Sequence, residues 1–214
     1  MNDPSPTLTA ARTLELAVVV PTFNERGNVP LLVERLEAAL SGVTWEVVFV
    51  DDDSPDGTAE AARELARQDG RIRVIQRIGR RGLSTACIEG MCATAAPVVA
   101  VIDGDLQHDE TLLPRMLRAL QDDAGLDLVV GSRFVAGGGT GEWDRDRAAK
   151  SAFATRLSRR ALRADLKDPM SGFFAIRTGI VRRLAPELSG IGFKILLDLM
   201  TARWPACPRR RARA

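Results

Sequence analysis

The stretch "EVVFVDDDSPDGT" (46–58) decides the fold class, because an apolar, β-branched run ends directly in a polar segment rich in turn-forming residues. Four further apolar runs of the same character lie at 16–20, 72–76, 98–102 and 126–131. Their uniform apolarity predicts strands buried on both faces, as in a mostly parallel sheet. The quoted stretch also places three adjacent carboxylates after its strand: Asp51, Asp52 and Asp53. We expect exposure at the sheet edge to ease the repulsion among them.

Helical patterns lie between the predicted strands. Apolar side chains recur at helical spacing from Val29 to Leu40. The same spacing runs from Leu112 to Leu120, and Asp109 is placed to cap that helix. Strands that alternate with helices indicate βαβ units. We therefore predict an α/β fold with a single Rossmann-like domain, in which helices cover both faces of a mostly parallel sheet.

The composition fits one globular unit. The chain has 214 residues, of which 45% are hydrophobic, and a single domain is the default at this length. We expect a flexible N-terminus over 1–15, a folded domain over 16–203 and a disordered basic tail over 204–214. No apolar run is long enough to span a membrane, and the polar start does not resemble a signal peptide, so we expect a cytoplasmic protein. Three cysteines, an odd number, favour small buried hydrophobes over a disulfide framework.

Charge is divided unevenly along the chain. Residues 1–132 hold 12 Lys and Arg against 21 Asp and Glu, whereas residues 133–214 hold 18 against 7. An acidic half can collect a metal cation, and a basic half can attract phosphates or an anionic membrane surface. The alternative is that the two halves only attract each other. We expect no nucleic-acid partner.

Polar motifs follow four of the predicted strands. Ligands of open α/β sheets bind beyond the carboxyl ends of the strands, so we expect these motifs to border one crevice. The motifs are "PTFNE" (21–25), "DDDSPDGT" (51–58), "DGDLQHDE" (103–110) and "GSRF" (131–134).

Asp103 and Asp105 are the sharpest local signal. Alternate side chains of extended backbone point the same way, so Asp-x-Asp at a strand end presents two carboxylates to one hard cation. With Gln107 as a further oxygen ligand, we predict a Mg²⁺ or Mn²⁺ site. One alternative is a solvated acidic loop. Another is a receiver domain, but that requires a Lys directly after the last strand, and none stands there.

The longer motifs carry a family resemblance. They are "VVVPTFNERGNVPLL", "FVDDDSPDGTAE", "RRGLSTACIEGM", "VAVIDGDLQHDE", "LVVGSRFVAGGG", "DPMSGFFAIR" and "GFKILLDLM". In this order they resemble the dolichol-phosphate mannose synthases, which are family 2 glycosyltransferases of the GT-A fold. The resemblance covers residues 16–200. It implies a metal-dependent, inverting transfer of mannose from GDP-mannose to a polyprenyl phosphate.

The resemblance also implies roles for individual residues. It assigns the nucleotide sugar to Pro21, Phe23, Glu25, Asp52, Asp103 and Asp105, the metal to Asp103, Asp105 and Gln107, and the acceptor phosphate to Arg133, Arg147 and Ser151. Arginine suits the last role because its fork of donors grips phosphate oxygens and keeps its charge. We take Asp105, Arg133 and Asp168 as the catalytic candidates. A polyprenyl phosphate is already an anionic nucleophile, so neither His108 nor another side chain has to act as a general base.

The basic segment 146–163 suits the lipid acceptor. It places Ala149, Phe153 and Leu157 on one helical face, as in helices that lie on an anionic membrane surface. An ordinary surface helix is the alternative. We therefore expect peripheral contact with the cytoplasmic face of the membrane, with a separate membrane protein as a further partner.

The sequence departs from the family pattern at two places. Asp53 stands where the family usually has Asn, and the chain after residue 200 lacks the usual Arg-containing segment. Two alternatives therefore stay open. One is a UDP-sugar-dependent undecaprenyl-phosphate glycosyltransferase, and the other is a truncated homologue that only binds nucleotide.

Overall fold

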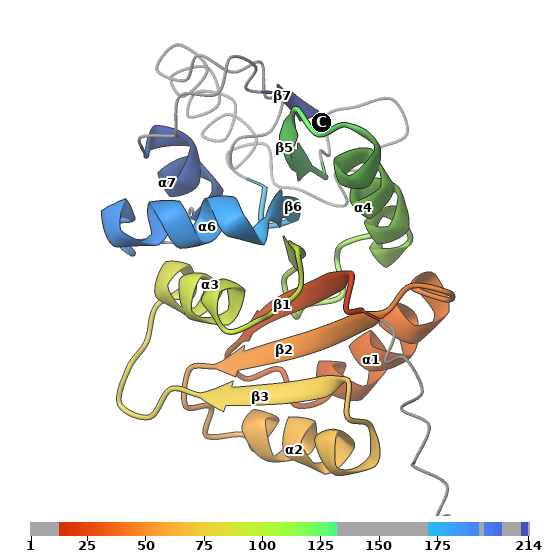
Figure 1. Cartoon of the computed structure of the whole chain (residues 1–214). Coiled ribbons are helices and arrows are strands. Elements are labelled where there is room, and N and C mark those ends of the chain that lie inside the picture. The colour runs from red at the N-terminus through yellow and green to blue at the C-terminus, as the bar shows by residue number, and fades with distance from the viewer. Residues whose placement is uncertain (1–12, 132–170, 193–194, 203–210, 214) are drawn as a thin grey trace, which may run out of the picture.

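The computed structural model describes residues 13–131, 171–192, 195–202 and 211–213. They form a layered α/β structure with helices packed against both faces of one sheet (Figure 1). No helix among these residues is both long and apolar enough to cross a membrane.

The described residues build a seven-stranded sheet in the order β3-β2-β1-β4-β6-β5-β7. The strands are β1 (Leu16–Thr22), β2 (Trp45–Asp51), β3 (Ile72–Gln76), β4 (Val98–Val101), β5 (Leu126–Val130), β6 (Phe174–Arg177) and β7 (Arg211–Arg213). Strand β1 pairs in parallel with β2 and β4, and β2 pairs in parallel with β3. The predicted mostly parallel sheet is confirmed, and the five apolar runs form β1 to β5.

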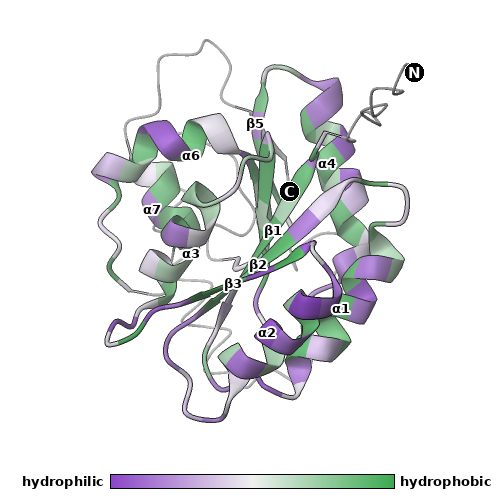
Figure 2. Cartoon of the chain, turned by 60° about the horizontal axis from the view of Figure 1, so that its bottom comes forward, coloured by the Kyte–Doolittle hydropathy of each residue, from purple (hydrophilic) through white to green (hydrophobic). Residues whose placement is uncertain are grey.

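Helices cover the two faces of this sheet. On one face lie α1 (Asn28–Ala39), α2 (Thr58–Gln68) and α4 (Leu113–Asp122), and on the other lie α3 (Leu83–Cys92), α6 (Thr178–Leu184) and α7 (Ile195–Thr201). A short 3-10 turn, η1 (Glu110–Leu112), precedes α4, and a second one, η2 (Ala185–Glu187), follows α6. Asp109 caps η1, the turn that leads into α4, rather than α4 itself: its Oδ1 accepts a hydrogen bond from the Thr111 N–H at 3.0 Å. Buried apolar residues of both helical layers pack against the sheet. In Figure 2, hydrophobic and hydrophilic residues alternate along the helices, as expected for helices with one buried face.

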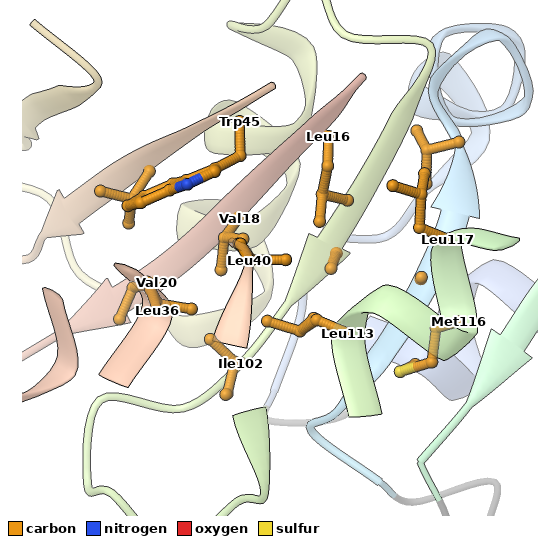
Figure 3. Packing of buried hydrophobic residues seen from close by; sticks show 14 of the residues in the cluster. Leu16, Val18, Val20, Leu36, Leu40, Trp45, Ile102, Leu113, Met116 and Leu117 are labelled. Carbon is orange, nitrogen blue, oxygen red and sulfur yellow. The ribbon is translucent and has the colours of Figure 1, made fainter. Parts of the chain in front are cut away.

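Alternation along β1 divides the core in two. Val18 and Val20 pack with α1 and α4 on one face, where Figure 3 shows them beside Leu36 and Leu113. Val19 between them belongs to the opposite cluster with α3 and α6. Every residue of β1 is buried, as expected for the central part of a sheet covered on both faces.

Strands β6 and β7 differ from the sequence-based expectations. Strand β6 enters the sheet antiparallel between β4 and β5 and was not predicted. Strand β7 lies in the segment for which we expected a disordered basic tail, and it pairs in parallel with β5. An unpaired sheet edge offers free N–H and C=O groups, which a short strand such as β7 satisfies.

Helix α3 approaches the sheet closely at Gly90. A Cβ atom at this position would lie 2.5 Å from Val19 Cγ1 and 2.8 Å from Val50 Cγ2, and both valines are fully buried. We expect Gly90→Ala to lower the free energy of unfolding by about 1–3 kcal/mol, measured by urea denaturation. Gly179→Ala in α6 is the control, because nothing lies within 4 Å of its Cβ position. Equal effects of the two substitutions would contradict this packing.

Candidate active site

A pocket of about 470 Å³ lies where β1, β2 and β4 reach their carboxyl ends. It is lined by Pro21, Thr22, Phe23, Glu25, Asp52, Arg81, Gly82, Leu83, Asp103, Gly104 and Asp105. All six residues that we predicted to bind a nucleotide sugar are in this lining. The volume is in the range of small-molecule sites, which are commonly found beyond the strand ends of α/β sheets.

Pro21 and Glu25 come from the end of β1. The paired register of β1 with β4 ends at Val19 and Val101, so Pro21 follows the last pair of that ladder, where its missing N–H is tolerated. The Glu25 N–H donates to Thr58 Oγ1 at 2.9 Å. This bond ties the loop after β1 to the start of α2, which fixes one wall of the pocket.

Two of the three adjacent aspartates hold the loops at the strand ends. Asp51 is fully buried, and its carboxylate accepts hydrogen bonds from the Thr22 hydroxyl and from the Ser54 N–H and hydroxyl. Asp53 accepts from Gln76 Nε2 at 2.9 Å. Neither lines the pocket. These two carboxylates therefore stabilise the turn after β2.

Asp52 does line the pocket, but it is only 8% exposed. Arg77 Nη1 donates to its Oδ1 at 2.7 Å, and the Gly82 N–H donates to its Oδ2 at 2.6 Å. The expectation that exposure eases the repulsion is therefore wrong for Asp52. A buried guanidinium compensates the charge instead, because a buried carboxylate needs a close cation or several hydrogen bonds.

Asp103 lies at the end of β4 and is fixed by two neighbours. His108 Nε2 is 3.1 Å from Asp103 Oδ2, and the His108 ring lies 5.3 Å from the ring of Phe173. A Cβ atom at Gly172 would come within 2.4 Å of the same Asp103 oxygen. The segment before β6 thus approaches the carboxylate as closely as backbone can.

Asp105 is exposed and shares the pocket with Asp103. Its Oδ1 accepts a hydrogen bond from the Gln107 N–H at 3.1 Å. The Gln107 side chain is exposed and is not part of the pocket lining, so the structure does not bring it to the two carboxylates. The backbone of Gln107 instead fixes Asp105.

The two carboxylates fit a hard divalent cation as a partial ligand set. No group of three His, Cys, Asp or Glu side chains that could hold a metal occurs in the part of the chain that the structure describes. Mg²⁺ in phosphate-binding sites usually takes one or two carboxylates and fills its other positions with waters and phosphate oxygens. The residues present therefore fit a metal that is bound together with a phosphorylated ligand.

Cys87 in α3 is buried, as predicted. Burial raises the pKa of its thiol well above the usual range, and the negative charges of Asp103 and Asp52 raise it further. The side chain stays protonated near neutral pH and does not provide a thiolate nucleophile. The prediction of burial is wrong for Cys92, the last residue of α3, which is exposed.

The loop after β3 and the first residue of α3 contribute three lining residues that were not predicted: Arg81, Gly82 and Leu83. The Arg81 guanidinium lies 4.5 Å from the centroid of the Phe23 ring, whose residue is 42% exposed. This cation–π contact forms another wall of the pocket. The motif "RRGLSTACIEGM" (80–91) carried part of the family resemblance, but no site residue was assigned to it. Its position after the strand 72–76 was the signal that could have identified these residues.

The predicted acceptor residues Arg133, Arg147 and Ser151 and the catalytic candidate Asp168 lie outside the described residues. Their neighbour Ser171 is described and buried. Its hydroxyl donates to the carbonyl oxygen of Gly131 at 2.8 Å, which joins the end of β5 to the segment before β6. The described residues Gly131 and Ser171 therefore lie close together, and Gly172 next to them approaches the pocket carboxylate Asp103.

The chain is similar to curated glycosyltransferases over most of its length. The family model described as glycosyl transferase family 2 matches residues 17–185. A dolichol-phosphate mannosyltransferase of Pyrococcus furiosus is 41% identical over 87% of this chain and 52% of its own length. The dolichol-phosphate mannosyltransferase of Saccharomyces cerevisiae is 34% identical over 88% of this chain and 70% of its own length. The polyprenol monophosphomannose synthase of Mycolicibacterium smegmatis is 36% identical over 92% and 74%. The chain thus spans between half and three quarters of these relatives.

Solved structures share the fold at lower sequence identity. Glucosyl-3-phosphoglycerate synthase from Mycobacterium tuberculosis, in complex with Mn²⁺, UDP-glucose and phosphoglyceric acid, matches with a TM-score of 0.62 and 22% identity over 91% of this chain and 73% of that one. A mannosyltransferase from Pyrobaculum calidifontis in complex with GDP-Man and Mn²⁺ matches with a TM-score of 0.56 and 22% identity over 79% and 46%. The fold is therefore that of nucleotide-sugar glycosyltransferases.

Proposed function

We propose that this chain, which belongs to glycosyl transferase family 2, transfers mannose from GDP-mannose to a polyprenyl phosphate with inversion at the sugar. The observation that carries the proposal is the convergence of three strand ends on a pocket with two carboxylates, Asp103 and Asp105. No Lys or Arg pairs with either of them among the described residues. The names of the three curated relatives support mannose as the sugar and a polyprenyl phosphate as the acceptor.

The nucleotide sugar occupies the pocket in this proposal. Phe23 and Arg81 offer a stacked aromatic and cationic wall, and Asp52 offers carboxylate oxygens to a donor N–H group. Asp103 and Asp105 would hold Mg²⁺ or Mn²⁺ with the diphosphate. When bound, the metal would stabilise negative charge on the departing nucleoside diphosphate. The solved complexes that contain Mn²⁺ support a divalent metal for this fold.

The acceptor side follows from the chemistry of its phosphate. A phosphate monoester is anionic near neutral pH, so its oxygen attacks the sugar carbon without losing a proton to a side chain. The chain has to hold two anionic reactants in line against their repulsion. We assign Arg133, Arg147 and Ser151 to the acceptor phosphate and Asp168 to the reaction centre, as proposals for positions outside the described residues.

A lipid acceptor requires contact with a membrane surface. We assign this contact to the basic segment 146–163, whose sequence pattern suits an anionic surface. The contact would be peripheral and on the cytoplasmic side, with a separate membrane protein as a further partner.

Donor preference is tested by binding without transfer. We expect GDP-mannose to bind in the presence of Mn²⁺ at least about tenfold more tightly than UDP-glucose, measured by isothermal titration calorimetry. Omission of the metal should weaken GDP-mannose binding. Tighter binding of the UDP-sugar would favour the alternative donor.

Transfer is tested separately with labelled mannose and a short polyprenyl phosphate. The expected product is polyprenyl-phosphate mannose with β stereochemistry. Binding of GDP-mannose without any product would instead identify a chain that retains only nucleotide binding.

A further inference from the structure

Arg77 is a buried charged residue beside the pocket rather than in it. It follows β3 and is only 2% exposed. Its Nη1 donates to Asp52 Oδ1 at 2.7 Å and to the Gly82 carbonyl at 3.1 Å, and its Nη2 donates to Thr85 Oγ1 at 2.6 Å. Its Nε lies 3.3 Å from Glu89 Oε2, outside hydrogen-bonding geometry. The planar fork of the guanidinium therefore contacts the turn after β2, the loop after β3 and helix α3 at once.

These contacts fix Gly82 from two directions. Its carbonyl accepts from Arg77, and its N–H donates to Asp52 Oδ2 at 2.6 Å. The Thr85 hydroxyl also donates to the Gly82 carbonyl at 2.8 Å. Both Gly82 and Asp52 line the pocket, whereas Arg77 does not. The buried ion pair between Arg77 and Asp52 thus fixes the position of the loop at Gly82 relative to the pocket.

The same contacts decide what Asp52 can recognise. Each carboxylate oxygen already accepts one strong hydrogen bond, and each has capacity for one more. The charge of Asp52 is compensated by Arg77, so a second cation has little to gain there. A neutral N–H donor of a ligand fits the remaining capacity.

The loop also positions Arg81. This residue directly precedes Gly82, and its guanidinium lies over the Phe23 ring. Movement of Gly82 would therefore shift the contact between Arg81 and Phe23 as well as the hydrogen bond to Asp52. One buried side chain controls two walls of the pocket.

We propose that Arg77 is the positioning residue of the donor site, which orients Asp52 toward an N–H edge of a nucleobase and holds Arg81 against Phe23. This inference rests on the proposed function, because it takes the ligand of the pocket to be a nucleotide. It adds a residue that touches neither the ligand nor the metal and acts through its neighbours.

The test compares Arg77→Met and Arg77→Lys with Arg80→Met as a matched control. Arg80 lies in the same loop, forms an exposed ion pair with Glu89 and does not line the pocket. We expect Arg77→Met to weaken GDP binding about tenfold or more by calorimetry, and Arg77→Lys to recover part of the loss. Arg80→Met should bind GDP as the unchanged chain does. In the transfer assay, Arg77→Lys should raise KM for the nucleotide sugar and leave KM for the acceptor unchanged.

A double substitution separates positioning from general stability. If Arg77 acts through Asp52, then Arg77→Lys combined with Asp52→Asn should bind GDP little more weakly than the poorer of the two single variants. Additive losses, or unchanged GDP binding in Arg77→Lys, would overturn the proposal. Should Arg77→Met fail to fold by circular dichroism, Arg77→Lys carries the test alone. GDP binding is measured without an acceptor, so absence of mannose transfer would count against the proposed function and not against this role.

Discussion

Asp105→Asn is expected to lower kcat/KM for sugar transfer about 10³-fold. The substitution keeps the size of the side chain and its acceptor for the Gln107 N–H, but it removes one of the two charges available to a metal. A carboxamide oxygen is a weaker ligand for a hard cation than a carboxylate. The loss should be accompanied by a weaker dependence of nucleotide binding on Mn²⁺, measured by calorimetry with and without the metal. The free energy of unfolding should change little, because Asp105 is exposed.

Asp53→Asn is the matched control for this prediction. It removes one negative charge from the same edge of the sheet, from a residue that does not line the pocket. Its backbone has φ of +58°, and Asn adopts this left-handed conformation readily. Its side-chain oxygen can still accept from Gln76 Nε2. Equal losses of activity in the two variants would mean that the total charge of the edge matters, and not a ligand role of Asp105.

Strands could be predicted from the sequence where they have a local pattern of apolar residues. Strand β2 and its neighbours are short, apolar and followed by polar turns, and each such run forms a strand as predicted. Strand β6 could not be predicted from the sequence in this way. It is separated from β5 by a long stretch of chain and pairs antiparallel with both β4 and β5, and pairing between distant segments leaves no local pattern. Phe174, the first residue of β6, is fully buried, and Phe173 before it is buried as well.

The residues of the candidate site also differ in whether a local sequence pattern reveals them. Asp103, Asp105 and Asp52 were found because each follows a strand, and the carboxyl ends of parallel strands meet at one edge. The partner of Asp52 was not found, since Arg77 stands 25 positions away and only the fold brings the two together. The charge on Asp52 therefore looked uncompensated in the sequence. A motif of three aspartates contains a fully buried, a nearly buried and a half-buried residue, and adjacency alone does not distinguish them.

Backbone strain is concentrated at this edge of the sheet. Within the described ranges, the non-glycine residues with positive φ are Asn24, Asp53 and Leu106, and they follow β1, β2 and β4. Asn and Asp tolerate this conformation, whereas a leucine adopts it at a cost of about 1–3 kcal/mol. Leu106 is held there because its side chain packs against the core and its carbonyl accepts from Arg35 Nη1 at 3.2 Å. The turn between Asp105 and Gln107 is therefore fixed by packing before any ligand binds.

Because the loops around Asp103 are fixed, a side chain added beside it should displace its carboxylate. The substitution Gly172→Ala tests this most directly. The new Cβ atom would lie 2.4 Å from Asp103 Oδ2 and 3.0 Å from its Cγ, so the carboxylate has to move. His108 and the backbone of β4 limit where it can go. We expect kcat/KM for sugar transfer to fall about 100-fold, since small displacements of catalytic groups are costly. The midpoint of thermal unfolding should shift by only a few degrees.

Gly70→Ala is the control for Gly172→Ala. Both glycines lie outside helices and strands, neither requires a positive φ, and nothing lies within 4 Å of the Cβ position at Gly70. Gly70→Ala should therefore leave both activity and stability nearly unchanged. If Gly172→Ala is destabilised so far that the unfolded fraction accounts for its loss of activity, the segment before β6 supports only the fold. A large loss of activity in a well-folded variant would show that Gly172 is needed because Asp103 must occupy the space beside it.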